Sequence, residues 1–282
     1  MKQSGEILSP AGKAVRWVCS AVLALYTCIA IFVLAVTLLD SFKTKSDLIS
    51  NLVGWPASFT LESFSAVLRQ DNFLLYFRNS ILLTVCGTGG CILLSSLTAY
   101  GISRYQFRGK SFLTSYLLVG MMVPIQVSVL PLFLILKKMS LLNTLYGLIL
   151  VYVSCISFPC FIFEKFFRTI PIALEESARI EGAGDLRIFF QIILPLCKPV
   201  IFTIALITGV GLWNDFYMPM VLLGSKTNQT LTLAIYVYLN QFMRNMNVSF
   251  AAVLITLVPV IIVYFVFSSQ LVEGLTGGAV KG

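Results

Sequence analysis

Residues 79–103 read NSILLTVCGTGGCILLSSLTAYGIS, a run without charge between Arg78 and Arg104. As an α-helix with a rise of 1.5 Å per residue, this run extends about 37 Å, enough to cross a hydrocarbon layer of roughly 30 Å. Its apolar and polar residues do not alternate with the period of two that a membrane β-barrel strand requires. The run therefore predicts a transmembrane helix.

Five other parts of the chain show the same pattern. The apolar runs predict six spans in all, at approximately 17–39, 79–103, 111–136, 139–163, 199–223 and 248–270. The first run is longer than the apolar region of a cleaved signal peptide, so we expect it to be retained. The spans leave an outer segment at 40–76, an inner loop at 164–198 and a tail at 273–282. We treat 1–282 as a single transmembrane domain.

The composition favours a polytopic membrane protein. Of the 282 residues, 58% are hydrophobic and 11% are charged, whereas an average soluble domain is roughly 25% charged. The chain contains no histidine, which excludes Ser-His-Asp and Cys-His catalysis and histidine metal sites. Its seven cysteines show no CxxC spacing. We therefore expect no catalytic residue and no metal in this chain.

The distribution of Lys and Arg predicts the orientation. The inner segments of a bundle with both termini inside hold more of these residues than its outer segments, although Lys137 and Lys138 run against the trend. The same distribution accounts for the net charge of +8 without a nucleic-acid partner. The predicted class is an all-α polytopic membrane protein with six transmembrane helices, N-in/C-in.

The inner loop at 164–198 is not a featureless linker. Ile172–Glu181 reads as a short helix, with acidic residues in its first turn, where the helix dipole favours them. Glu175 and Arg179 are spaced four residues apart, which predicts a surface ion pair between them.

The short helix ends in a glycine turn. Gly182 suits the left-handed conformation that terminates a helix. Asp185 suits the N-cap of a second helix over Leu186–Leu194. Small and charged residues dominate the surface of this helix–turn–helix. It is compatible either with a helix pair lying on the membrane or with a docking element for a cytoplasmic partner.

The loop also carries a family motif. Its residues resemble the EAA loop of ABC importer permeases, which reads EAA, three residues, G, nine residues, I-x-L-P. The matching residues are Glu176-Ser177-Ala178, Gly182 and Ile192-Ile193-Leu194-Pro195, with Ser177 in place of Ala. Other family-like motifs are Phe77–Ser80, the prolines Pro124 and Pro131, the box Trp213–Phe216 and the tail Leu275–Gly282. Together they resemble the carbohydrate-uptake permeases of the maltose-transporter type, most closely the maltose-G-like second subunit.

This resemblance implies a type I ABC importer permease fold with a cytoplasmic coupling helix, in the bacterial cytoplasmic (inner) membrane. The implied function is ATP-driven import of a sugar or oligosaccharide by alternating access, coupled through residues 172–184. The implied partners are a second homologous permease, two ATPase subunits, an extracytoplasmic sugar-binding protein and membrane lipid, with no nucleic acid. ATP and Mg would be held by the partner subunits, with no cofactor in this chain.

The resemblance also implies which residues contact the ATPase. In the loop they are Glu176, Ser177, Ala178, Gly182, Ala183, Gly184, Leu194 and Pro195. In the tail they are Gly278, Val280, Lys281 and Gly282. The chain itself lacks a nucleotide-binding loop. Gly109-Lys110-Ser111 matches the end of that motif, but Arg104 stands where its first glycine is required.

The transport path is marked less clearly. Candidate residues that face it are Asn79, Gln126, Trp213, Asn214 and Asp215. Hydrogen bonding between helices is the alternative role for these polar residues. The glycine cluster at 87–90 and the single Gly147 predict close helix packing.

Three alternatives to a sugar importer stay open at this point. They are an ABC permease for a non-sugar solute, an ion-coupled secondary carrier and a membrane scaffold without transport. Asp215 is the acidic residue that an ion-coupled carrier would use.

Overall fold

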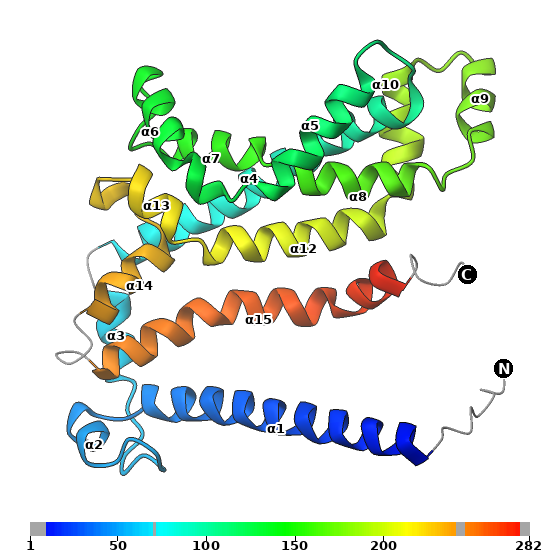
Figure 1. The fold of residues 1–282 in the computed structure, drawn as a ribbon. Helices are drawn as coiled ribbons and strands as arrows, with labels where there is room; N and C mark the ends of the chain where they lie inside the picture. Colours follow the sequence, from blue (N-terminus) through cyan, green and yellow to red (C-terminus); the bar gives the residue numbers. More distant parts are fainter. Residues whose placement is uncertain (1–9, 70–71, 241–245, 277–282) are drawn as a thin grey trace. The chain divides into compact units, whose positions relative to one another are not determined.

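The computed structural model describes residues 10–69, 72–240 and 246–276, and its regular structure within these ranges is entirely helical. In chain order the elements are α1 (Pro10–Ser41), α2 (Lys45–Ser50), α3 (Glu62–Arg69), α4 (Phe73–Arg104), α5 (Lys110–Met122), η1 (Ile125–Ser128), α6 (Val129–Lys138), α7 (Leu145–Ser154), α8 (Ser157–Phe167), α9 (Ala173–Ile180), α10 (Asp185–Ile188), η2 (Phe189–Ile193), α11 (Leu194–Leu196), α12 (Lys198–Asn214), α13 (Tyr217–Leu222), η3 (Lys226–Asn228), α14 (Leu231–Asn240) and α15 (Met246–Thr276) (Figure 1). The predicted all-α class is confirmed.

The helices include segments long and apolar enough to cross a membrane. Three single helices in the described ranges qualify by length and composition: Gly12–Ser41, Phe73–Arg104 and Met246–Val266. Three bent pairs also qualify, Lys110–Met122 with Ile125–Lys138, Leu145–Ser154 with Ser157–Phe167, and Asp185–Leu196 with Lys198–Asn214. The number of candidate spans reaches six if each bent pair is one span.

The predicted third, fourth and fifth spans are not single straight helices. The third bends by 99° at Pro124, whose extended backbone separates α5 from η1. The fourth starts at α7, after an irregular stretch that follows α6, and bends by 42° between α7 and α8. The predicted fifth span, 199–223, is interrupted because α12 ends at Asn214 and the backbone of Asp215 is extended.

The chain divides into two compact units, one of residues 1–69 with 241–255 and the other of residues 70–240 with 256–282. In the larger unit, α4 is the central helix and packs against α7, α8 and α12. One apolar core surrounds the Arg104 end of α4 and includes Tyr100, Phe163 and Phe189. A second core lies farther along α4, around Leu83 and Tyr152. Both ends of α4 are therefore held by buried side chains.

Two glycines of α4 let α7 approach closely. A Cβ atom added at Gly90 would lie 2.5 Å from Cγ2 of Val153, and one at Gly87 would lie 3.1 Å from Cβ of Tyr152. A Cβ at Gly90 would displace its neighbour, and one at Gly87 would be an unusually tight contact. The predicted packing role of residues 87–90 is thus confirmed at these two positions. Gly147 instead allows an approach of loop backbone, since its Cβ would lie 2.3 Å from the carbonyl oxygen of Leu141.

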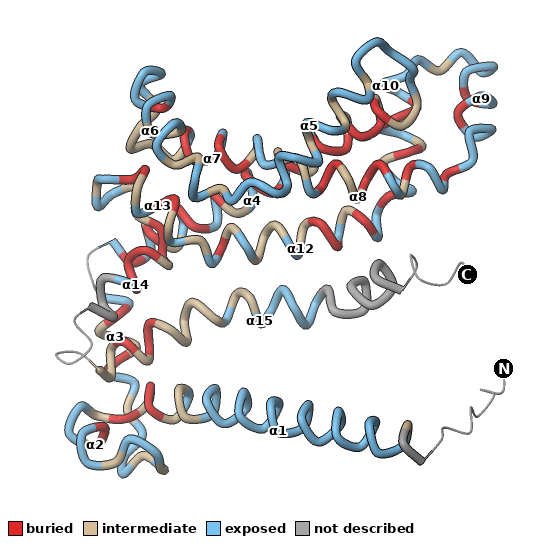
Figure 2. Tube along the Cα trace, in the orientation of Figure 1, coloured by how far each residue is buried: buried red, intermediate tan, exposed pale blue. Residues whose placement is uncertain are grey.

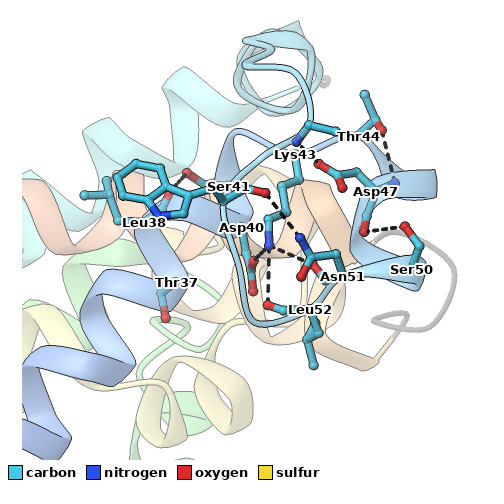
Figure 3. Close-up of polar contacts among 12 residues, drawn as sticks. Thr37, Leu38, Asp40, Ser41, Lys43, Thr44, Asp47, Ser50, Asn51 and Leu52 are labelled. Carbon is cyan, nitrogen blue, oxygen red and sulfur yellow. Dashed lines mark hydrogen bonds and ion pairs between the residues drawn. The ribbon is translucent and has the colours of Figure 1, made fainter.

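The smaller unit contains α1 and the outer segment that follows it. Figure 2 shows α1 exposed along most of its length, as expected for an apolar helix that lipid would surround. The chain then folds back at the end of α1. Lys43 Nζ donates to Asp40 Oδ1 at 2.7 Å and to the backbone oxygens of Asn51 and Leu52 at 2.7 and 3.4 Å (Figure 3). These bonds tie the loop after α2 to the end of α1.

Candidate functional site

The predicted helix–turn–helix is present, with α9 (Ala173–Ile180) followed by α10 (Asp185–Ile188), and it lies at one end of the larger unit (Figure 1). The turn between the helices is a Schellman motif. Gly182 has φ +86°, its N–H donates to Arg179 O, and the N–H of Ala183 donates to Ala178 O, both at 3.0 Å. This pattern ends a helix at a left-handed residue, the role predicted for Gly182.

The second helix differs slightly from its prediction. It begins at Asp185 itself, with Gly184 as the N-cap, so the predicted N-cap role of Asp185 is wrong by one residue. The helix continues through a π-helical turn at η2 and then α11. Such π-turns appear mostly as single-turn bulges inside α-helices and are frequently found at functional sites.

One face of α9 is tied to the end of α4. Glu175, whose side chain is 2% exposed, accepts a hydrogen bond from Arg104 Nε at 2.6 Å and another from the Tyr100 hydroxyl at 2.9 Å. Arg104 also donates to Ile170 O at 3.0 Å. The predicted Glu175–Arg179 ion pair is therefore wrong. The physical reason is that Glu175 lies on the buried face of α9, where the guanidinium of Arg104 satisfies its charge.

Arg179 instead bridges the glycine turn. Its guanidinium lies 3.0 Å from Asp185 Oδ1, and both side chains are about half exposed. Hydrogen bonding from Tyr105, and then from Arg179, holds the pKa of Asp185 below its ordinary value. Burial and hydrogen bonding to Asp185 raise the pKa of Tyr105. The carboxylate is thus ionised at neutral pH, and its pair with Arg179 links the two helices across the turn.

The opposite face of α9 is free within the described structure. Ile172, Glu176 and Ile180 are spaced four residues apart and are all exposed, Ile180 to 88%. Residues four apart in a helix lie on the same side. The helix therefore presents a stripe of two isoleucines flanking a carboxylate, a surface suited to protein contact.

The predicted coupling residues divide between exposed and packed positions. Glu176, Ser177, Gly182, Gly184 and Pro195 are exposed, Ala183 and Leu194 are partly buried, and Ala178 is buried in the core of the larger unit. Ala178 thus packs inward. The predicted tail contacts Gly278, Val280, Lys281 and Gly282 lie outside the described residues.

Two of the predicted path residues bind the protein's own backbone. Asn79 Nδ2 donates to Thr227 O and Gln229 O, each at 2.9 Å. Trp213 Nε1 donates to Thr256 O at 3.2 Å. Both side chains are buried. In this conformation their polar atoms hold helices and loops together, the alternative role that the sequence left open.

Asp215 is also engaged by the protein. Its Oδ2 accepts from the Tyr152 hydroxyl at 2.8 Å, and its Oδ1 accepts from the backbone N–H groups of Tyr217 and Met218. Asp215 therefore binds the first N–H groups of α13 and ties them to α7. Two predicted path residues, Gln126 and Asn214, are exposed. Gln126 lies at the sharp bend after Pro124.

An apolar groove of about 460 Å³ runs along α4, α12 and the part of α15 after Thr256. Thr84 and Thr88 line it, and their buried hydroxyls have no hydrogen-bond partner in the described structure. Five other threonines bond the carbonyl four residues back: Thr27, Thr37, Thr98, Thr114 and Thr203. The groove is lined almost wholly by carbon atoms. Elsewhere too, the described residues contain no group of three His, Cys, Asp or Glu side chains that could hold a metal ion.

Two residues that organise the site, Tyr100 and Arg104, were not predicted from the sequence. Tyr100 and Arg104 are spaced four residues apart at the end of α4, which places them on one helix face. The available signal was this spacing together with an acidic residue on a short helix, 71 residues farther along the chain. Asn143, a further polar residue that the sequence offered for the transport path, adopts φ +61° and bonds three residues, Leu222, Ser225 and Asn228.

Comparisons with known proteins agree with this architecture. Residues 91–275 match the family described as "Binding-protein-dependent transport system inner membrane component". The diacetylchitobiose uptake system permease NgcG of Streptomyces coelicolor is 32% identical, over 93% of this chain and 87% of that protein. The multiple sugar-binding transport system permease MsmG of Streptococcus mutans is also 32% identical, over 88% of this chain and 91% of that protein.

A solved structure shares the fold. A chain of a bacterial ABC transporter involved in the import of the acidic polysaccharide alginate superposes with a TM-score of 0.81 at 22% identity, covering 94% of this chain and 99% of that one. The matched family region contains the whole of the helix–turn–helix, from α9 to α11. The chain therefore belongs to the inner membrane components of binding-protein-dependent transport systems and has the fold of an ABC importer permease.

Proposed function

We propose that this chain is a permease subunit of an ATP-driven importer that carries a sugar or oligosaccharide across the bacterial cytoplasmic membrane by alternating access. The proposal rests on one observation: the exposed stripe of Ile172, Glu176 and Ile180 on α9 lies within the matched family region. The sugar follows from the relatives, named as permeases for diacetylchitobiose, for multiple sugars and for arabinooligosaccharides.

The proposed assembly contains a second homologous permease, two ATPase subunits and an extracytoplasmic sugar-binding protein. ATP and Mg belong to the ATPase subunits, because this sequence carries no complete phosphate-binding loop. The chain is then a transport subunit rather than an enzyme. The bundle has six spans, three of them bent pairs, with both termini and α9 on the cytoplasmic side.

The contact with the ATPase is proposed to use the exposed face of α9, with the Schellman turn keeping α9 and α10 at a fixed angle. Closure of the ATPase dimer would push on this face, and the helices packed behind it would follow. An ion-coupled carrier is less well supported, since both oxygens of Asp215 are already bonded within the protein.

The test is co-purification with the proposed partners. Co-expressed ATPase subunits should remain bound to the native chain and be lost from Glu176→Lys, because the substitution reverses a charge at the centre of the exposed stripe. The matched control is Glu62→Lys, which reverses an exposed charge at the start of α3 in the outer segment. Candidate sugars, added with the binding protein, should raise ATP hydrolysis. If Glu176→Lys retains the ATPase as firmly as Glu62→Lys does, α9 is not the coupling surface.

A further inference from the structure

Helix α4 is bonded near each of its ends to a different segment of the larger unit. At the Arg104 end, the fastening is the buried contact of Glu175 with Arg104 and Tyr100. At the other end, Asn79 donates to Thr227 O and Gln229 O. We call the first contact the α9 joint and the second, which includes the neighbouring Ser80, the loop joint.

The contacts of the α9 joint resist separation. Its ion pair is nearly inaccessible to water, with Arg104 8% and Glu175 2% exposed, and both carboxylate oxygens are used. Separating a buried, hydrogen-bonded ion pair is costly, because each charge would be left without a partner. A displacement of α9 is therefore passed to α4 more readily than it breaks the joint.

The loop joint has the same character. Asn79 uses both amide hydrogens on loop carbonyls, and the Ser80 hydroxyl accepts from the N–H of Leu231 at 2.9 Å. Asn79 and Ser80 are each 3% exposed. These bonds fix the outer loop, residues 223–230, to the turn of α4 where they originate. A movement of that turn carries the loop with it.

Between the joints α4 is one continuous helix. From Asn79 to Arg104 the helix rises over 25 residue steps, about 38 Å at 1.5 Å per step, which is more than the thickness of the hydrocarbon layer. A regular helix behaves as a rigid element on this scale. The larger unit thus contains a continuous mechanical path from α9 to the outer loop.

We propose that α4 transmits movement of α9 to the outer loop at 223–230. Glu175, Arg104 and Tyr100 are the positioning residues that couple α9 to α4. This inference rests on the proposed function for the source of the movement. It adds that the outer loop responds to ATP through one helix, and that breaking either joint uncouples it without releasing the ATPase.

The test uses the complete importer in lipid nanodiscs, with the partner permease, ATPase subunits and sugar-loaded binding protein. A spin label on Lys226→Cys reports the outer loop, since Lys226 is exposed, and the chain without this substitution gives the background from its seven cysteines. A non-hydrolysable ATP analogue should change the mobility of the label. Glu175→Gln should reduce that change roughly 2- to 30-fold, the range for substitutions along a coupling path, with the ATPase subunits still bound.

The matched control is Glu164→Gln. It removes an ion pair of the same 2.6 Å length, with Arg168, but this pair lies along α8 and its arginine is largely exposed. The label response should be unchanged. Tyr100→Phe, which removes one of the two contacts to the carboxylate, should give a smaller loss than Glu175→Gln. If the Glu175→Gln chain does not assemble, Tyr100→Phe decides: a reduced response supports the proposal, and an unchanged one overturns it.

The two joints act in series, which gives a second measurement. Asn79→Ala should also reduce the label response, because it removes the two bonds that hold the loop to α4. A normal label response in Asn79→Ala would overturn the proposal. So would a normal response in Glu175→Gln with the ATPase bound. Failure of the native chain to bind any ATPase subunit would instead refute the proposed function.

Discussion

Lys43 Nζ lies 2.7 Å from Asp40 Oδ1 at the end of α1, and both side chains are at most 1% exposed. The second carboxylate oxygen of Asp40 is buried and has no hydrogen-bond partner in the described structure (Figure 3). The pair ties the loop after α2 to the end of α1 through the backbone oxygens of Asn51 and Leu52. The local fold of the outer segment therefore depends on a charge pair shielded from water.

Lys43→Met should strongly destabilise the outer segment. Removing one partner of a buried ion pair leaves an uncompensated charge, at a cost of about 3–5 kcal/mol. Limited proteolysis of the purified chain should show earlier cleavage near residues 51–52. The double variant Asp40→Leu with Lys43→Met removes both charges and should resist proteolysis better than Lys43→Met alone. Equal sensitivity of the two variants would show that the buried charge is not the cause.

Gly182→Val should weaken the turn between α9 and α10. A β-branched residue at φ +86° adopts a conformation that costs roughly 1–2 kcal/mol. We expect a lower thermal midpoint and less ATPase in co-purification. The control is Gly224→Ala, at an exposed position outside the helix–turn–helix with no atom within 4 Å of the added Cβ, which should bind the ATPase as the native chain does. If Gly182→Val behaved like Gly224→Ala, the left-handed turn would not matter for docking.

Gly147→Ala should destabilise the larger unit. The added Cβ would lie 2.3 Å from the carbonyl oxygen of Leu141, a backbone atom that cannot move aside cheaply. Overpacking of this kind costs roughly 1–3 kcal/mol, which thermal denaturation in detergent would detect as a lower midpoint. Gly89→Ala, in α4 with open space around the added Cβ, provides the comparison and should not lower the midpoint. Equal midpoints would mean that the loop at Leu141 adapts.

Asp215→Asn distinguishes an importer driven by ATP from a carrier driven by ions. Asparagine keeps one oxygen to accept the N–H groups at the start of α13, so the fold should persist. Sugar uptake by the reconstituted importer should continue and stay independent of an imposed proton gradient. Asp215→Ala should be less stable by about 1–3 kcal/mol, because the buried Tyr152 hydroxyl loses its partner. Uptake abolished by Asp215→Asn in a folded chain would favour ion coupling.

Features that depend on neighbouring residues in the chain could be predicted from the amino-acid sequence. The charge-free run 79–103 predicted a membrane-length helix because a helix in lipid must satisfy its own backbone. Gly182 marked the end of α9 because glycine adopts a left-handed backbone without steric cost. The spacing from Glu176 to Pro195 indicated the family, and the comparisons confirmed it.

Which distant groups meet depends on how the helices pack in the folded chain. Spacing along the chain offered Arg179 as the partner of Glu175, whereas the fold brings Arg104 to it from 71 residues away. Asn79, expected to face a transport path, is bonded to loop carbonyls 148 and 150 residues later. A helix pattern states which face a residue occupies, but the partner on that face is set by how helices pack. For the buried carboxylate of Glu175 and the buried amide of Asn79, helix packing determines which groups they bind.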